Sequence, residues 1–162
     1  MSDAHLHLVV NHFPIIGTIF GLGILIAGLA SKNNAIKNTA YVLFIVAAVF
    51  AFASMYTGEG AEEMVEDMPN IGKHIIHEHE ELAEKLAILL YALAAFSIAS
   101  LYTAVKNHKY AKITSLITLI LALGAVVLGS FVGTSGGEIR HTEIRENILQ
   151  TTTDIDSKKE EK

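Results

Sequence analysis

The sequence predicts an all-α fold: an integral membrane four-helix bundle with both termini outside the cytoplasm. Of the 162 residues, 51% are hydrophobic, and the mean hydropathy is positive, at +0.42. The apolar residues are grouped into four runs without the polar stripe of a soluble bundle, and about twenty apolar residues cross a hydrocarbon core roughly 30 Å thick. The four runs are 14–30, 40–55, 82–102 and 113–132.

The chain is predicted to form one domain at residues 1–149, followed by a polar tail at 150–162 that we expect to be disordered. Residues 3–12 fit a helical lead-in to the first span. Pro14 suits the first turn of that span, where a missing N–H costs nothing. Glycines four residues apart predict close helix packing in the first and fourth spans; the pairs are Gly17 with Gly21 and Gly129 with Gly133.

The second span is expected to end at residues 56–58. A short acidic stretch follows at 59–67, with apolar residues spaced for one helical face, which predicts an amphipathic segment lying at the membrane interface between the second and third spans. Residues 69–72 carry a turn signal, and the third helix begins near His74.

After the fourth span, the glycine-rich stretch 133–137 predicts a sharp reversal that would fold residues 138–141 back over the bundle mouth. The order of elements also suggests a two-fold repeat of helix hairpins. Each half reads as helix, lysine loop, helix and outer segment.

The charges predict an orientation in the membrane. The loops at 31–38 and 103–112 carry lysines and no acidic residue, whereas 58–81 is rich in glutamate. The positive-inside rule places the two lysine loops in the cytoplasm, so both termini and the acidic stretch face outward. The protein is therefore expected to be a multi-pass inner (cytoplasmic) membrane protein with extracytoplasmic termini.

Several classes of function are excluded by composition. The chain has no cysteine, so thiolate ligands and disulfides are absent. Basic residues are few and dispersed, which argues against nucleic acid as a partner. There is no nucleotide-phosphate loop, and no serine or threonine stands out as a nucleophile. The pattern fits an enzyme and an electron carrier equally.

Seven of the eight histidines fall at the predicted outer end of the bundle, and His108 alone falls at the other end. His12 directly precedes the first span, His79 lies one turn before the third, and His141 follows the fourth. Neutral imidazole binds zinc, copper, iron and haem, and carboxylates add harder oxygen ligands. Glu59 and Glu62, three residues apart, accompany these histidines as metal-ligand candidates. Each of these histidines and glutamates could equally be a surface or structural side chain without a ligand.

The segment His7-Leu-Val-Val-Asn-His12-Phe13-Pro14 resembles the His-Pro-x-x-Val-His-Phe-Pro opening of bacterial membrane proteins named domain of unknown function 2231, with Leu8 in place of the proline. The resemblance continues at Thr57-Gly58, His79 and Gly136-Gly137-Glu138…His141. It implies a bacterial protein in which His12, His79 and His141 are the strongest site positions, followed by His7, with Glu59 and Glu62. Relatives accompany Rieske-type iron–sulfur domains, which implies a redox setting.

The first hypothesis is a membrane-bound electron-transfer protein that binds a b-type haem at the extracytoplasmic end of the bundle. Two histidines from different helices would ligate the haem b iron, and Arg140 and Arg145 would pair with its propionates. Electrons would pass through a quinol or a small soluble extracytoplasmic carrier.

Two alternatives remain open at this point. One is a non-haem copper, zinc or iron ion held by His12, His79, His141 and a glutamate. The other is an accessory subunit of a membrane respiratory complex, or a homo-oligomer, whose histidines serve hydrogen bonds or a pH response. In every case the lipid bilayer is a partner.

Overall fold

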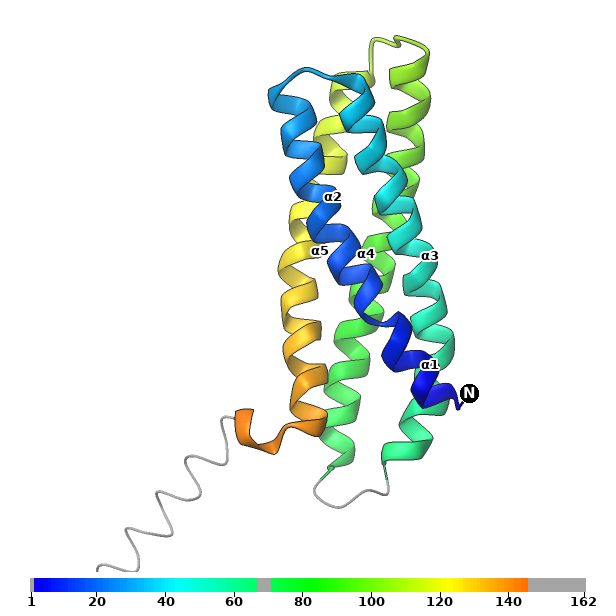
Figure 1. Cartoon of the computed structure of the whole chain (residues 1–162), viewed down its shortest axis with the longest axis vertical. Coiled ribbons are helices and arrows are strands. Elements are labelled where there is room, and N and C mark those ends of the chain that lie inside the picture. The colour runs from blue at the N-terminus through cyan, green and yellow to red at the C-terminus, as the bar shows by residue number, and fades with distance from the viewer. Residues whose placement is uncertain (1, 67–70, 146–162) are drawn as a thin grey trace, which may run out of the picture.

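The computed structural model describes residues 2–66 and 71–145, which fold entirely as helices (Figure 1). α1 and α2 are separated only by Asn11, and together they form one span, Asp3–Ala30. With α3, α4 and α5 this gives four segments long and apolar enough to cross a membrane, as the sequence predicts. The elements are α1 (Asp3–Val10), α2 (His12–Ala30), α3 (Asn34–Val65), α4 (Lys73–Val105), α5 (Ala111–Arg140) and the short 3-10 helix η1 (Thr142–Ile144).

The helices lie side by side, with the two lysine loops at the upper end of Figure 1 and the N-terminus and η1 toward the lower end. We call these the lysine end, which contains Lys32 and Lys109, and the histidine end, which contains His7, His79 and His141. α2 runs obliquely across the bundle, so that α1 lies beside α3 at the histidine end (Figure 1).

Many large apolar side chains of the spans are exposed on the outside of the bundle. In the most apolar window of each span only 28% to 33% of the residues are buried. Phe20, Phe52 and Ile88 are each about two-thirds exposed, at 66%, 66% and 68%. Such exposure is unfavourable in water but matches a bundle surrounded by lipid tails.

Small residues allow the helices to approach closely, as the glycine pairs predict. A Cβ atom on Gly21 would lie 2.6 Å from the ring of Phe44 in α3, and one on Gly17 would lie 3.4 Å from Ala47. On α5, the position of a Cβ on Gly129 or Gly133 is within 3.9 Å of Ile15 in α2. The packing interpretation of both glycine pairs is therefore confirmed.

The two lysine loops turn in the same way. In each loop the residue after the helix C-cap has a positive φ: Lys32 at 53° and Asn107 at 48°. The left-handed conformation reverses the chain within a few residues. α3 then begins at Asn34 and is capped by Asn33, whose side-chain oxygen accepts hydrogen bonds from the N–H groups of Ala35 and Ile36.

The end of α3 differs from the prediction. The second span does not stop at residues 56–58, and the acidic stretch is not a separate interfacial segment, because α3 continues without a break to Val65. The glycines in this stretch are accommodated by contact with α1: a Cβ on Gly58 would lie 3.6 Å from His7, and one on Gly60 would lie 2.7 Å from Asp3. Packing against α1 thus offsets the low helix propensity of glycine. Asp67, the last residue of the predicted segment, lies outside the described residues.

The end of α5 is a second correction. The glycine-rich stretch 133–137 does not reverse the chain, since α5 runs on to Arg140, so residues 138–141 do not fold back over the bundle. The helix persists because Gly133 and Gly136 lie against Ile15 and His79 of neighbouring helices. The tail at 150–162 lies outside the described residues.

Near the lysine end, hydroxyl groups connect α3, α4 and α5 inside the bundle. The Tyr41 hydroxyl lies 2.6 Å from Ser115 Oγ, and Ser100 Oγ lies 3.0 Å from Thr118 Oγ1. Ser115 and Thr118 also donate to carbonyl oxygens one turn earlier in α5, those of Ala111 and Thr114. The cluster therefore joins the three helices, and the Ser115 hydroxyl is hydrogen-bonded both to Tyr41 and to its own helix.

Candidate functional site

At the histidine end, His7 is held between α1 and α3. Its Nδ1 atom lies 3.0 Å from the carbonyl oxygen of Ser54 and 3.3 Å from Thr57 Oγ1. The side chain is half-buried, and its ring lies beside Gly58. Because α1 packs on α3, the His7 ring lies against the turn of α3 that contains Ser54 and Thr57.

His79 is held between α4 and α5 in a corresponding way. Its Nδ1 atom lies 2.9 Å from Ser135 Oγ, and its ring is in close contact with Gly136. The side chain is half-buried, because His79 lies on the same packed face of α4 as the buried Leu86, seven residues further along the helix.

The two histidines occupy equivalent places in the two halves of the chain. Each lies toward the histidine end of the first helical segment of a hairpin and contacts a hydroxyl–glycine pair on the second helix: Thr57-Gly58 for His7, Ser135-Gly136 for His79. Each hydroxyl also bonds to the carbonyl three residues before it, Thr57 to Ser54 and Ser135 to Val132. This correspondence supports the two-fold hairpin repeat that the order of elements suggests.

The hydrogen bonds define which ring nitrogen carries the hydrogen. A carbonyl oxygen only accepts, so Nδ1–H of His7 donates to Ser54. The hydroxyl hydrogen of Ser135 goes to the Val132 carbonyl, 3.1 Å away, so Ser135 Oγ accepts from Nδ1–H of His79. In the neutral state both rings therefore keep a lone pair on Nε2. This is the arrangement in which a backbone or side-chain acceptor orients a ligating imidazole. Neutral imidazole is the form of histidine that binds a metal ion or a haem iron, through the lone pair of its unprotonated ring nitrogen.

Two other predicted site histidines are exposed and make local contacts. His12 Nδ1 lies 3.3 Å from the carbonyl of Leu8, one turn earlier. His141 ends α5 and lies 2.9 Å from Glu143. Because the backbone N–H of Glu143 and the His141 ring donate to its carboxylate, the pKa of Glu143 lies below its usual value. The structure places neither His12 nor His141 in the hydrogen-bonded arrangement of His7 and His79.

The remaining predicted site residues lie around this end. Glu59 is exposed and Glu62 half-buried, both in the last turns of α3. Arg145 is bonded to the end of α5: its Nε donates to the Glu138 carbonyl at 2.7 Å and its Nη2 to that of Ile139 at 3.0 Å. Arg140 is the last residue of α5 and is exposed.

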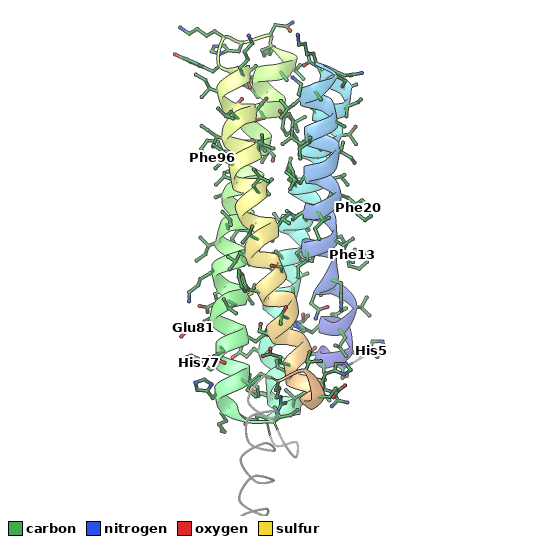
Figure 2. All side chains as sticks on the ribbon, turned by 90° about the vertical axis from the view of Figure 1, so that its left-hand side faces the viewer. His5, Phe13, Phe20, His77, Glu81 and Phe96 are labelled. Atoms are coloured by element: carbon green, nitrogen blue, oxygen red, sulfur yellow. The ribbon has the colours of Figure 1, made fainter. Side chains whose placement is uncertain are left out.

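The other histidines of this end lie on the outer surface. His74 is 3.5 Å from Glu78, and His77 is 3.3 Å from Glu81, each pair four residues apart on the surface of α4. Figure 2 shows His5, His77 and Glu81 directed away from the bundle at its lower end. Within residues 2–66 and 71–145, no three or more histidines, cysteines, aspartates or glutamates come together as a metal-ligand group.

Sequence reasoning missed the acceptors that fix the two rings. Ser54 and Ser135 carry no signal as single residues, and Thr57 was noted only through the resemblance. The usable signal was the repeat: a hydroxyl residue followed by glycine occurs at 57–58 and again at 135–136. Reading the two halves together would have selected His7 and His79 over His12 and His141.

The comparisons with known proteins add one match. A family model described as "Predicted membrane protein (DUF2231)" matches residues 4–143. Neither the search of curated proteins nor the search of solved structures found a match to the chain.

Proposed function

This chain belongs to the DUF2231 family of predicted membrane proteins, and we propose that it is a membrane-bound electron-transfer protein that binds a b-type haem between His7 and His79. The observation that carries the proposal is the matched pair of hydrogen bonds from Nδ1, which leaves a lone pair on Nε2 of each ring that can bind an iron. The two histidines come from different hairpins, so a bound haem would also join the two halves of the bundle.

The donor set fits a haem better than a bare metal ion. A low-spin b-type haem needs two axial side-chain ligands, because its porphyrin supplies the other four nitrogens. A zinc site usually takes three or four protein ligands, and the described residues bring no such group together. A copper, zinc or iron ion at the same histidines is therefore the second reading, which the experiment below distinguishes.

The chain's own residues would contribute binding, orientation and polarity. His7 and His79 would supply the axial nitrogens, while Ser54 and Ser135 fix the rotation of each ring about its hydrogen bond. When bound, the haem supplies reversible one-electron chemistry, and the polarity and exposure of its surroundings influence its potential.

The charge distribution supports an orientation. The loop between α2 and α3, with Lys32, and the loop between α4 and α5, with Lys109, lie together at the end of the bundle opposite α1 and η1 (Figure 1). With the lysine end in the cytoplasm of a bacterial inner membrane, both termini and the site are extracytoplasmic. The electron partner is then a quinol or a soluble carrier on the outer side, alone or within a respiratory complex.

The test is an absorption spectrum of the detergent-purified full-length protein from haem-replete cells, oxidised and dithionite-reduced, with elemental analysis of the same sample. We expect a Soret band with sharp reduced α and β bands. His7→Ala and His79→Ala should each abolish the low-spin spectrum, whereas the matched controls His12→Ala and His141→Ala should retain it. A haem-free protein with stoichiometric copper, zinc or iron would favour the second reading, and a protein with neither would overturn both.

A further inference from the structure

Five lysines lie at the lysine end of the bundle, and no acidic residue lies among them. The chain has no aspartate or glutamate between Asp3 and Glu59, or between Glu84 and Glu138. None of the five lysines makes an ion pair with a residue that the structure describes. Their charges are therefore balanced only by groups outside the described protein. The five are Lys32 and Lys37 beside the loop between α2 and α3, and Lys106, Lys109 and Lys112 beside the loop between α4 and α5.

The two described lysines of the histidine end are placed differently. Lys73 lies 3.3 Å from the carboxylate of Glu66, and Lys85 lies 3.0 Å from that of Glu81. Because each already has a carboxylate partner on the protein surface, an external anion gains less from binding there. The lysine end is thus the surface at which the protein presents uncompensated positive charge.

The lipid-facing apolar surface continues up to the loop between α4 and α5. Val105, the last residue of α4, is 69% exposed, and Ile113, in the first turn of α5, is 56% exposed. Tyr110 is exposed between them, and tyrosine is enriched at the membrane–water interface. Lys106 directly follows Val105 and Lys112 directly precedes Ile113. These two lysines therefore lie at the level of the lipid headgroups.

The loop between α4 and α5 is short and internally hydrogen-bonded. The N–H of His108 donates to the carbonyl of Thr103 at 2.9 Å, and the N–H of Ala111 donates to the carbonyl of His108 at 3.0 Å. The ammonium group of Lys109 lies over the Tyr110 ring, 5.1 Å from its centroid. An ordered backbone thus carries three lysines within seven residues. Binding an anion here loses little entropy in ordering the loop.

We propose that the lysine end binds the phosphate groups of anionic phospholipids, with the loop between α4 and α5 as the main part of the site. A lipid matches both features of this surface, because its phosphate meets the ammonium groups while its acyl chains cover Val105 and Ile113. A free phosphate ion or an acidic soluble protein matches only the charge. The inference depends neither on the haem nor on the side of the membrane that the lysine end faces.

The test titrates the full-length protein in neutral detergent with phosphatidylglycerol and, separately, with phosphatidylcholine of the same acyl chains, and counts the retained lipids by native mass spectrometry. We expect wild type to prefer phosphatidylglycerol. The double variant Lys106→Gln/Lys109→Gln should lose about 25-fold of this preference, from about fivefold for each lysine at a membrane surface. The matched control Lys73→Gln/Lys85→Gln also removes two positive charges, but from lysines paired with glutamate, and should keep the preference.

Equal binding of the two lipids by wild type would overturn the inference, and so would an equal loss of preference in the two double variants. Salt gives a second measurement that needs no substitution. Screening should reduce the preference of wild type, and a preference unchanged at high salt would contradict a site based on charge.

Inorganic phosphate distinguishes the lipid from a soluble anion. We expect phosphate at the same concentration as phosphatidylglycerol to leave lipid binding unchanged, because it lacks the acyl chains that cover the apolar surface. If phosphate displaces the lipid instead, the lysines bind a soluble phosphate and the assignment to phospholipid is wrong.

Discussion

The ring of His79 packs directly on Gly136: its Cε1 atom lies 3.0 Å from the position that a Cβ atom would occupy on that glycine. Glycine here permits the imidazole of α4 to lie against the backbone of α5. The ring is then within 2.9 Å of Ser135 Oγ, the acceptor that orients it.

Gly136→Ala should therefore lower cofactor content while leaving the fold intact. The added methyl group pushes the ring away from Ser135, whereas alanine raises helix propensity by about 0.5 to 1 kcal/mol. The bound cofactor is measured by absorption or elemental analysis, and stability by thermal melting. Gly124→Ala is the control, because its methyl group would meet only Leu89 at 3.7 Å. Equal cofactor content in both variants would contradict the prediction.

Removing the hydroxyl partner of each ring should have unequal effects. Ser135→Ala removes the Oγ acceptor of His79, while Thr57→Val leaves His7 with the Ser54 carbonyl at 3.0 Å. Loss of such a partner typically weakens metal affinity about 10- to 100-fold. We expect Ser135→Ala to lose cofactor during dialysis against imidazole and Thr57→Val to retain it. The reverse order would argue against the assigned hydrogen bonds.

Gly21 and Gly23 form a matched pair in α2. A Cβ atom on Gly21 would lie 2.6 Å from the Phe44 ring, whereas one on Gly23 meets nothing within 4 Å. Gly21→Ala should lower the free energy of unfolding by about 1 to 3 kcal/mol through overpacking. Gly23→Ala should raise it by about 0.5 to 1 kcal/mol through helix propensity. Unfolding in mixed micelles measures both, and a loss of stability in Gly23→Ala would be inconsistent with the packing described.

The hydrogen bond between Tyr41 and Ser115 joins α3 to α5 inside the bundle, with 2.6 Å between the oxygens. Tyr41→Phe should reduce the free energy of unfolding by about 0.5 to 1 kcal/mol, the usual value of such bonds in membrane bundles. The loss stays small because Ser115 still donates to the Ala111 carbonyl. Tyr102→Phe, at a tyrosine that is 63% exposed, is the control and should change little.

The absence of cysteine makes the membrane orientation directly testable. Single cysteines at Ser2, near the histidine end, and at Lys109, in a lysine loop, should react from opposite sides of the membrane. We expect a membrane-impermeant maleimide to label Ser2→Cys in intact cells and Lys109→Cys only after the membrane is opened. The opposite pattern would reverse the proposed orientation.

The spans and their orientation signals were readable from the chain. Four apolar runs, the lysine loops and the pairs Gly17–Gly21 and Gly129–Gly133 predicted the bundle and its close packing, because hydropathy, loop charge and residue size act locally. Helix ends were predicted less well. Residues 56–58 and 133–137 read as helix ends because glycine favours turns, but contacts with α1 in the first case, and with α2 and α4 in the second, keep them helical.

By itself, the sequence determined the class of the protein and the end of the bundle at which seven of its eight histidines lie, because both follow from the residue types present and their order. Only the tertiary structure decided which histidines are hydrogen-bonded to a neighbouring helix. His12 and His141 have the more conspicuous sequence contexts, yet they are exposed; His7 and His79 meet their acceptors Ser54 and Ser135 across 47 and 56 residues of chain. Such long-range contacts depend on how the helices pack, and a local sequence pattern does not predict that packing.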